Sequence, residues 1–392
     1  MTTAPDRFDS PATTWLACLL YPVGPAAIVL MPMIVGALID TYGYTEQQAG
    51  NIAAAEGMGV VVSSVAAALW IRRASWVRAL LLSFLAYAAL NAASANVAAY
   101  GPLLALRFLT GLAGGNLFAV SVAALGDNRE PDRAFGLAQA VQGVLMLGAF
   151  ASAPALVEAG GAGALYYLLG GAALVVLVLV RGFPAAGRVQ AAAATMGAAT
   201  QQTGLILLGL FASVLFFVNV FGFWAFVERI GLGAGLPADT IGLALGASQV
   251  VAIGGALGAA WASHRYGRYW PLVLVLVGQV GALLALRDSF GVATYYVATG
   301  VFQALFIVGV SYQMGAIAEL DLKGRFLVMM TAAQGLGSAV GPALAGGLIR
   351  GDDYGGVVQL AVATCVLGSL LFILIVWRSR PAPQSTLAPP AL

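Results

Sequence analysis

Residues 203–228 read TGLILLGLFASVLFFVNVFGFWAFVE, an apolar run whose first charged residue is Glu228 at its end. A helix that crosses the hydrocarbon core of a bilayer needs about 20 mostly apolar residues. Eleven further runs have a similar length and composition: 14–39, 46–71, 77–95, 100–125, 134–158, 162–181, 238–262, 270–287, 291–318, 326–349 and 356–377. Each is continuously apolar rather than alternating as in barrel strands. The sequence therefore predicts an all-α membrane protein with twelve transmembrane helices.

The composition and the placement of basic residues support this prediction and orient it. Hydrophobic residues make up 61% of the chain and charged residues 9%, which excludes a water-soluble fold. Of the 18 Lys and Arg residues, 14 lie in alternate gaps and in the two tails, where cytoplasmic loops concentrate positive charge. Both termini are therefore expected in the cytoplasm. Because the basic residues are spread over seven segments, no nucleic-acid partner is indicated.

The chain divides into two similar halves. We expect a cytoplasmic tail at 1–13, a six-helix bundle at 14–181, a cytoplasmic linker at 182–202, a second six-helix bundle at 203–378 and a cytoplasmic tail at 379–392. An offset of 192 residues aligns the following pairs: Gly50 with Gly242, Arg73 with Arg265, Arg133 with Arg325, Gln142 with Gln334, and Gly143 with Gly335. One offset that serves several loops and helices indicates an internal repeat. Each half has an even number of helices, so an axis along the membrane normal should relate them.

Several motifs lie within and between the predicted helices. The gap after the eighth helix reads His264-Arg265-Tyr266-Gly267-Arg268, and the gap after the second reads Arg72-Arg73-Ala74-Ser75-Trp76-Val77-Arg78. The fourth helix contains Arg107-x-x-x-Gly111-x-x-Gly114-Gly115, and the eleventh contains Gly337-x-x-x-Gly341-Pro342. Over residues 14–378 the chain resembles the major facilitator superfamily of secondary transporters.

That resemblance implies two bundles that open a central pathway alternately to either side of the membrane. It assigns a gating role to four loop residues: Arg73, Arg265, Gly267 and Arg268. In the second copy of the loop motif, His264 stands where the family has an acidic residue that makes a charge lock between the bundles.

Two charged residues within the predicted spans are candidates for proton coupling. Polar side chains are costly at membrane depth and mark helices that face a cavity. Glu56 lies near the middle of the second helix, where a carboxylic acid can bind and release a proton as the cavity opens to alternate sides. Arg107 keeps its charge, so it must be paired, hydrated or bound to an anion. If the two residues pair when the protein is empty, protonation of Glu56 would release Arg107 for a substrate carboxylate. Alternatively, both residues are structural.

Uncharged residues near mid-membrane are candidates for substrate binding. The amides are Gln142, Gln334, Asn219, Gln249 and Gln303. The aromatic candidates are Phe217, Phe221 and Trp224, which share one helix face at i, i+4 and i+7, and Tyr21 beside the prolines of the first helix. Amides also join neighbouring helices, and aromatic residues also pack or anchor at the membrane surface. Near the outer ends, Glu228 with Arg229 is either a gate or a solvated pair, and Asp40 is most simply a solvated cap.

No motif indicates an enzyme or a bound cofactor. The sequence has no Gly-x-x-x-x-Gly-Lys-Ser/Thr loop for ATP, and its one histidine, His264, cannot form a metal cluster or a catalytic triad alone. Cys18 and Cys365 both fall inside predicted spans, so a metal site or a structural disulfide is not expected.

These features favour a secondary active transporter that moves a small organic solute by alternating access. The preferred substrate is an organic anion or aromatic acid carried with protons, as an uptake symporter, because the fifth helix lacks the Gly-x-x-x-Gly-Pro typical of exporters in the resembled family. The alternatives are a drug/proton antiporter for amphipathic compounds, a passive facilitator and a non-transporting receptor. The expected partners are the solute, protons and the lipid bilayer. We expect a monomer in the cell membrane, as in a bacterial inner membrane.

Overall fold

The computed structural model describes residues 10–71, 73–128, 131–184, 203–263, 267–287, 289–320 and 325–379. The first half contains α1 (Pro11–Leu20), α2 (Ala26–Val29), α3 (Met31–Tyr42), α4 (Glu46–Trp70), α5 (Trp76–Ala95), α6 (Tyr100–Gly126), α7 (Pro131–Leu177) and the 3₁₀ turn η2 (Val178–Gly182). The second half contains α8 (Thr203–Gly233), α9 (Ala238–Ser263), α10 (Tyr269–Ala285), α11 (Val292–Leu320), α12 (Arg325–Gly346) and α13 (Gly355–Arg378).

The first predicted helix is not continuous. It begins at Pro11 rather than at residue 14, and it is interrupted between Leu20 and Ala26 and again at Leu30. Pro22 and Pro25 lie in the first interruption, where their missing N–H groups cannot continue a helical ladder. Pro32 instead lies in the first turn of α3, where no N–H partner is needed. The first crossing is thus built from α1, α2 and α3.

The fifth and sixth predicted helices are joined in α7. Gly160 and Gly161 have non-helical dihedrals inside it, and the φ of +62° at Gly161 is one that residues with a Cβ rarely adopt. The chain therefore turns between the predicted spans 134–158 and 162–181. By length and composition alone, eight of the described helices qualify as membrane spans, and α7 is counted once among them. With the interrupted first crossing, the two crossings of α7, and α10 and α12, the fold of twelve crossings is confirmed.

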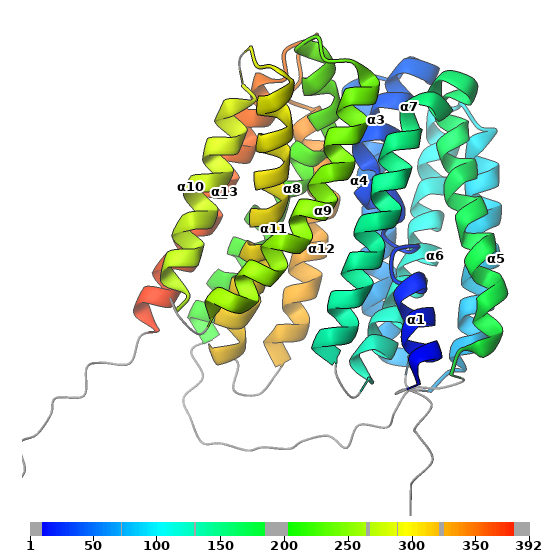
Figure 1. The fold of residues 1–392 in the computed structure, drawn as a ribbon, viewed down its shortest axis with the longest axis horizontal. Coiled ribbons are helices and arrows are strands. Elements are labelled where there is room, and N and C mark those ends of the chain that lie inside the picture. The colour runs from blue at the N-terminus through cyan, green and yellow to red at the C-terminus, as the bar shows by residue number, and fades with distance from the viewer. Residues whose placement is uncertain are drawn as a thin grey trace, which may run out of the picture.

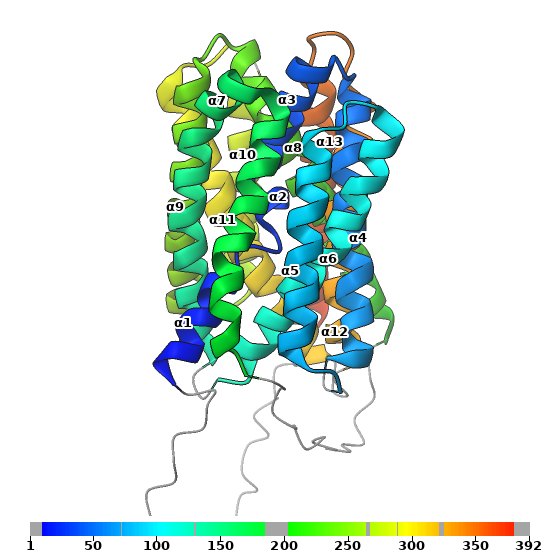
Figure 2. The same ribbon diagram turned by 90° about the vertical axis from the view of Figure 1, so that its right-hand side faces the viewer.

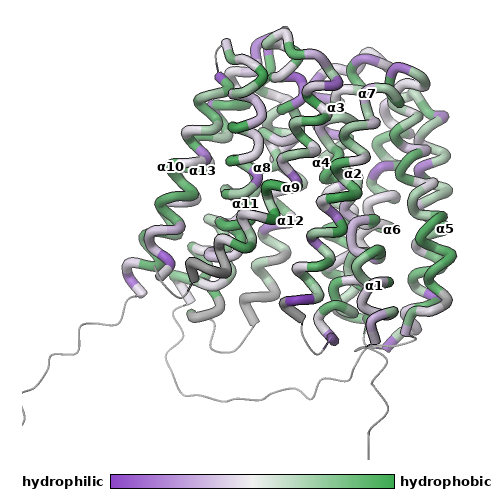
Figure 3. Tube along the Cα trace, viewed as in Figure 1, coloured by the Kyte–Doolittle hydropathy of each residue, from purple (hydrophilic) through white to green (hydrophobic). Residues whose placement is uncertain are grey.

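Figures 1 and 2 show the helices running roughly side by side, with α1–α7 in one bundle and α8–α13 in the other. The start of α1 and the end of α13 lie at the same end of the molecule, which we call the terminal end; the opposite end is the distal end. The bundles lie closest at the distal end and spread apart toward the terminal end (Figure 1). Hydrophobic residues run along the outer helices α5 and α10, as Figure 3 shows.

The two bundles meet along α4 with α12 and along α7 with α9. A Cβ atom at Gly50 would overlap the carbonyl oxygen of Pro342, and one at Gly242 would lie 2.5 Å from that of Phe150. Gly242 follows Gly50 by 192 residues, and Pro342 follows Phe150 by the same number. The repeat seen in the sequence therefore places glycines where backbone must approach backbone, once in each interface.

A second pair of contacts obeys the same symmetry closer to mid-membrane. Gly143 lies against the side chain of Ile253, and Gly335 lies against that of Val61. Closer to the terminal end, Val65 and Leu69 on α4 are exposed. The interfaces described here therefore run from the distal end to about the middle of the helices, and the structure is a distal-closed conformation.

Candidate transport site

A buried ion pair joins α4 to α6 near mid-membrane. Arg107 donates from Nε to Glu56 Oε2 at 3.2 Å and from Nη2 to Glu56 Oε1. Its Nη1 donates to Asn91 Oδ1 at 2.9 Å and lies 3.5 Å from Ser94 Oγ, both on α5. The guanidinium carbon lies 4.4 Å from the ring centroid of Tyr166 on α7. All three guanidinium nitrogens thus have protein partners, and Arg107 has no exposed surface.

The glycines of the Arg107 motif explain how this pair forms. A Cβ at Gly111 would overlap the carbonyl oxygen of Glu56, and a Cβ at Gly59 would overlap that of Phe108. Because neither glycine has a side chain, the backbones of α4 and α6 come into contact. The arginine lies one turn before Gly111, so its side chain reaches the carboxylate of Glu56 without leaving the bundle.

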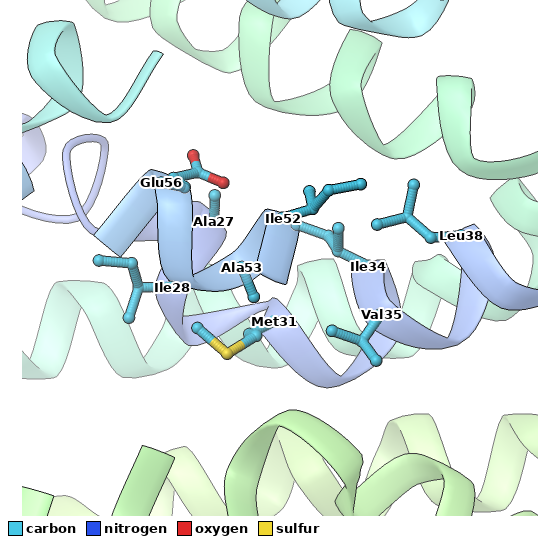
Figure 4. A pocket seen from close by; sticks show the side chains of 9 residues that line it. All are labelled: Ala27, Ile28, Met31, Ile34, Val35, Leu38, Ile52, Ala53 and Glu56. Atoms are coloured by element: carbon cyan, nitrogen blue, oxygen red, sulfur yellow. The ribbon is translucent and has the colours of Figure 1, made fainter. Parts of the chain in front are cut away.

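Glu56 also lines a small internal cavity of about 10 Å³. The other lining residues are aliphatic or sulfur-containing and come from α2, α3 and α4: Ala27, Ile28, Met31, Ile34, Val35, Leu38, Ile52 and Ala53. Figure 4 shows the carboxylate at one end of the cavity beside Ala27, with Leu38 at the other end. A cavity of this size holds about one water molecule. The carboxylate therefore has charge compensation from Arg107 and borders a small space that is otherwise lined by apolar side chains.

In the second bundle, an uncharged network holds the helices together. Asn219 on α8 donates to Gln279 Oε1 on α10 at 3.0 Å, and Gln279 Nε2 lies 3.4 Å from the carbonyl oxygen of Phe302 on α11. Cys365 on α13 contacts the same Gln279 oxygen at 3.5 Å. Asn219 was a candidate for substrate binding; the structure places it fully buried in this network.

The remaining amide candidates lie at or near the interfaces between the bundles. Gln142 and Gln334 are half-buried and precede the interface residues Gly143 and Gly335. Each of these two and Gln249 has one buried amide atom without a hydrogen-bond partner among the described residues: Gln142 Oε1, Gln334 Nε2 and Gln249 Nε2. Asn219 Oδ1 and both amide atoms of Gln313 on α11, a residue not singled out from the sequence, are also buried without a partner in the described part of the chain. Gln303 on α11 is buried. The unpartnered amide atoms have almost no accessible surface in this conformation, so they could bind a solute or water only after the bundles move.

The predicted aromatic face is divided between two environments. Phe217 and Phe221 stack at 5.9 Å between ring centroids, and both contact Phe306 on α11. Trp224 instead donates its indole N–H to the carbonyl oxygen of Val29 at 2.9 Å, across the interface between the bundles, and its ring is edge-on to Phe150. Tyr21 contacts Phe118 within the first bundle at 5.2 Å between ring centroids.

The predicted gating loops are only partly described. Arg73 is exposed just after α4, and Arg265 lies outside the described residues. Gly267 has a φ of +59°, which favours glycine at that turn. Arg268 lies against Gly315 on α11, since a Cβ at that glycine would be 3.2 Å from Arg268 Nε. In this conformation Arg268 therefore contacts its own bundle.

At the distal end, the sequence suggested Glu228 with Arg229 as a gate or a solvated pair, but it did not show the partner of Arg229 in the other bundle. Arg229 on α8 donates from Nη1 to Asp40 Oδ1 at 2.8 Å and from Nη2 to Asp40 Oδ2 and to the carbonyl oxygen of Gly36. Asp40 and Gly36 belong to α3, so this pair joins the two bundles. The interpretation of Asp40 as a solvated cap missed this partner, although the Asp40 side chain is exposed. Only the positions near helix ends were visible in the sequence, and these do not show which helices are neighbours.

Comparisons with known proteins agree with this fold. The model of the Major Facilitator Superfamily matches residues 16–206 and 209–391. A bacterial homologue of the human lysosomal transporter Spinster, in an inward-facing and unoccupied conformation, matches with a TM-score of 0.73 and 13% identity, over 97% of this chain and 100% of that one.

Two other solved structures are similar over most of their length. The nucleoside transporter NupG matches with a TM-score of 0.74 and 11% identity, covering 93% of this chain and 98% of that one. A D-xylose–proton symporter matches with a TM-score of 0.75 and 14% identity, covering 92% of this chain and 96% of that one. At these identities the likeness concerns the fold alone. The search of curated proteins gave no match.

Proposed function

Because this chain belongs to the Major Facilitator Superfamily, whose fold serves secondary transport, we propose that it is a proton-coupled transporter in which Glu56 carries the proton. The observation that carries the proposal is the buried Glu56–Arg107 pair, in which the carboxylate also lines a cavity large enough for about one water molecule. Ionisable residues at membrane depth are costly, and they are typical of ion pathways.

The geometry suggests how a proton alters the site. When Glu56 is protonated, its charge is lost and Arg107 Nε and Nη2 lose their anionic acceptor. Asn91, Ser94 and the ring of Tyr166 still hold the guanidinium in place. An unpaired buried guanidinium is unfavourable, so it attracts another anion or draws in water. Protonation of Glu56 is therefore linked to the binding of an anion or water by Arg107.

For the substrate, we propose an organic anion or aromatic acid that enters with the proton. In this conformation no guanidinium nitrogen of Arg107 is open to a carboxylate, so the anion binds after Glu56 is protonated. The other groups proposed to contact it are the amides of Gln142, Gln334, Gln249 and Gln303 and the rings of Phe217, Phe221 and Tyr21. Asn219 and Trp224 are engaged in protein contacts here and contribute only if the helices rearrange.

We also propose the orientation and direction of transport. The basic residues concentrated in the loops of the terminal end support a cytoplasmic position for that end, and the distal-closed conformation would then be closed to the outside. The protein then acts as a monomeric uptake symporter in the cell membrane of a bacterium, with Arg73, Arg265, Gly267 and Arg268 gating the cytoplasmic side. Its partners are the solute, protons and the lipid bilayer.

A thermal-shift screen in detergent tests the substrate and the coupling together. A ligand that binds the folded state raises the apparent melting temperature. The panel contains aromatic and aliphatic acids, sugars, amino acids and hydrophobic drugs, each at about pH 5 and about pH 8. We expect stabilisation by organic acids that is stronger at the lower pH and independent of pH in Glu56→Gln. Stabilisation by hydrophobic cations alone would indicate a drug antiporter instead.

A further inference from the structure

The distal contact contains one more acidic residue than its single arginine can balance. Arg229 has Asp40 on one side and Glu228 on the other, so the three side chains carry two negative charges and one positive charge when all are ionised. The side chain of Asp40 is 55% exposed, whereas that of Glu228 is 7% exposed. The surplus negative charge is therefore the buried one.

The hydrogen bonds show which of the two carboxylates accepts from Arg229. Both oxygens of Asp40 accept from the terminal nitrogens of Arg229. Glu228 Oε2 lies 3.2 Å from Arg229 Nε, but neither atom makes a hydrogen bond within the described residues. A buried carboxylate oxygen without a donor is unfavourable while it is charged. In this conformation Glu228 has a neighbour of opposite charge, but no hydrogen bond that would keep it ionised.

Other groups packed around Glu228 do not supply the missing charge. On α3 its carboxylate lies against the backbone of Gly36, which offers no side chain. On α11 the Tyr295 hydroxyl donates to the carbonyl oxygen of Val227 at 2.9 Å. Before α13, burial raises the pKa of Tyr354 to about 12, so that hydroxyl stays protonated. Among the described residues, the charged groups that act on Glu228 are Arg229 and Asp40.

We infer that Glu228 is a second proton-binding site, which takes up a proton when the distal end closes and releases it when the distal end opens. In the closed form, protonated Glu228 is neutral and Arg229 is balanced by Asp40. When the bundles part, Asp40 leaves with α3 and is solvated. Arg229 then turns to ionised Glu228 on its own helix, and the proton passes to the distal solvent. Each form balances the buried charge, and no other ion is required.

This exchange of partners has a definite consequence for pH. A ligand shifts an equilibrium toward the state that binds it more tightly, and here the ligand is the proton. Acid should therefore stabilise the distal-closed state. The inference rests on the proposed function only in requiring that the distal end opens and closes. It does not require Glu56 to carry a proton.

Spin labels at the distal end provide the test. Ala99, before α6, and Ala238, at the start of α9, are exposed and lie in different bundles, while Cys18 and Cys365 are buried and should resist labelling. Distances between labels in the full-length Ala99→Cys/Ala238→Cys protein, reconstituted in lipid nanodiscs, report the ratio of closed to open molecules. Between about pH 8 and about pH 5 we expect this ratio to rise about tenfold, as for a tenfold difference in proton affinity between the two states.

Two substitutions should then act in opposite directions. Glu228→Gln mimics the protonated form and should keep the distal end closed at both pH values. In Asp40→Asn, Glu228 is the acidic partner of Arg229 in both states. This variant should therefore favour the open form at both pH values. A wild-type ratio that does not change with pH, or a Glu228→Gln protein that keeps the wild-type pH response, would overturn the inference.

Glu56→Gln separates this site from the central pair. We expect this variant to keep the distal pH response, since it leaves Glu228, Arg229 and Asp40 intact. If the pH response were lost in Glu56→Gln but kept in Glu228→Gln, the response would be assigned to Glu56. That result would overturn the second proton-binding site and leave the proposed function standing. Melting temperatures close to that of the wild type identify the variants that are folded, and only those are compared.

Discussion

At the scale of the residue, the central pair shows how a charge is kept inside the membrane. Arg107 is held by a carboxylate, an amide, a hydroxyl and an aromatic ring, which come from α4, α5 and α7. Burying two charges costs several kcal/mol each, and their attraction offsets this only when the hydrogen bonds are well made. Glu56 and Arg107 should therefore depend on each other for stability.

Removing one partner should destabilise the protein more than removing both. Arg107→Met leaves the Glu56 carboxylate buried without its counter-charge, and we expect a loss of about 3–5 kcal/mol. The double variant Arg107→Met/Glu56→Gln should recover much of that loss, and a double-mutant cycle from denaturant unfolding measures the difference. Arg287→Met removes an exposed arginine and should change stability little. Additive effects at Arg107 and Glu56 would show that the pair is not coupled.

The two repeat-related glutamines should affect binding more than folding. Gln142 Oε1 and Gln334 Nε2 are buried without partners, so replacing either residue with leucine removes an unsatisfied polar atom. We expect stability to be unchanged or slightly improved, and the affinity for ligands found in the thermal-shift screen to fall about tenfold, for one lost hydrogen bond to a solute. Titration calorimetry measures that affinity. Unchanged affinity in both variants would remove these residues from the substrate site.

At the scale of the element, glycines decide which helices come into contact. Gly111 and Gly59 bring α6 onto α4, while Gly50 and Gly242 bring the two bundles together at equivalent places. The proline-rich first crossing is divided into three short helices, and Trp224 contacts the carbonyl oxygen of Val29 beside the break before α3. The helix interruptions and glycine contacts therefore build the distal closure as well as the central site.

A methyl group at either symmetric glycine should disfavour the closed form. In Gly50→Ala the new Cβ would overlap the backbone of Pro342, and in Gly242→Ala it would overlap that of Phe150. Each backbone clash exists only while the bundles touch, so both variants should shift the label distances at the distal end toward the open form. Gly148→Ala is the matched control on α7, because nothing lies within 4 Å of its Cβ position. If the label distances in Gly50→Ala and Gly242→Ala equalled those in Gly148→Ala, the symmetric interface would be contradicted.

Most of the elements could be predicted from the sequence, since length and apolar composition are sufficient to recognise a membrane crossing. The offset of 192 residues also predicted the equivalence of Gly50 with Gly242 and of Gly143 with Gly335. The partners of the polar residues could not be predicted. Asn219 was a candidate for the substrate site, but it donates a hydrogen bond to Gln279 inside one bundle. Asp40 and Arg229 are 189 positions apart, and only the packing of α3 on α8 makes them a pair.

At the scale of the whole molecule, the structure is one conformation of a protein that must adopt at least two. The bundles meet from the distal end to mid-membrane. The described contacts there include backbone approaches at glycines, the indole hydrogen bond of Trp224, a hydrogen bond from Gln47 to the carbonyl oxygen of Ala343 and the Arg229–Asp40 ion pair. Glu56 lies ten positions after the start of α4, about 15 Å along the helix. In the proposed mechanism, this depth would let a proton on Glu56 reach either side of the membrane as the bundles move.

Transport in proteoliposomes tests the role of Glu56 most directly, with a labelled acid found in the thermal-shift screen as the solute. We predict that the wild type accumulates it against its gradient when a pH gradient is imposed, and that Glu56→Gln loses this accumulation but still exchanges labelled for unlabelled solute at equilibrium. Glu158→Gln, which alters an exposed acid, should behave like the wild type. Full accumulation by Glu56→Gln would contradict the assignment of the coupled proton to Glu56.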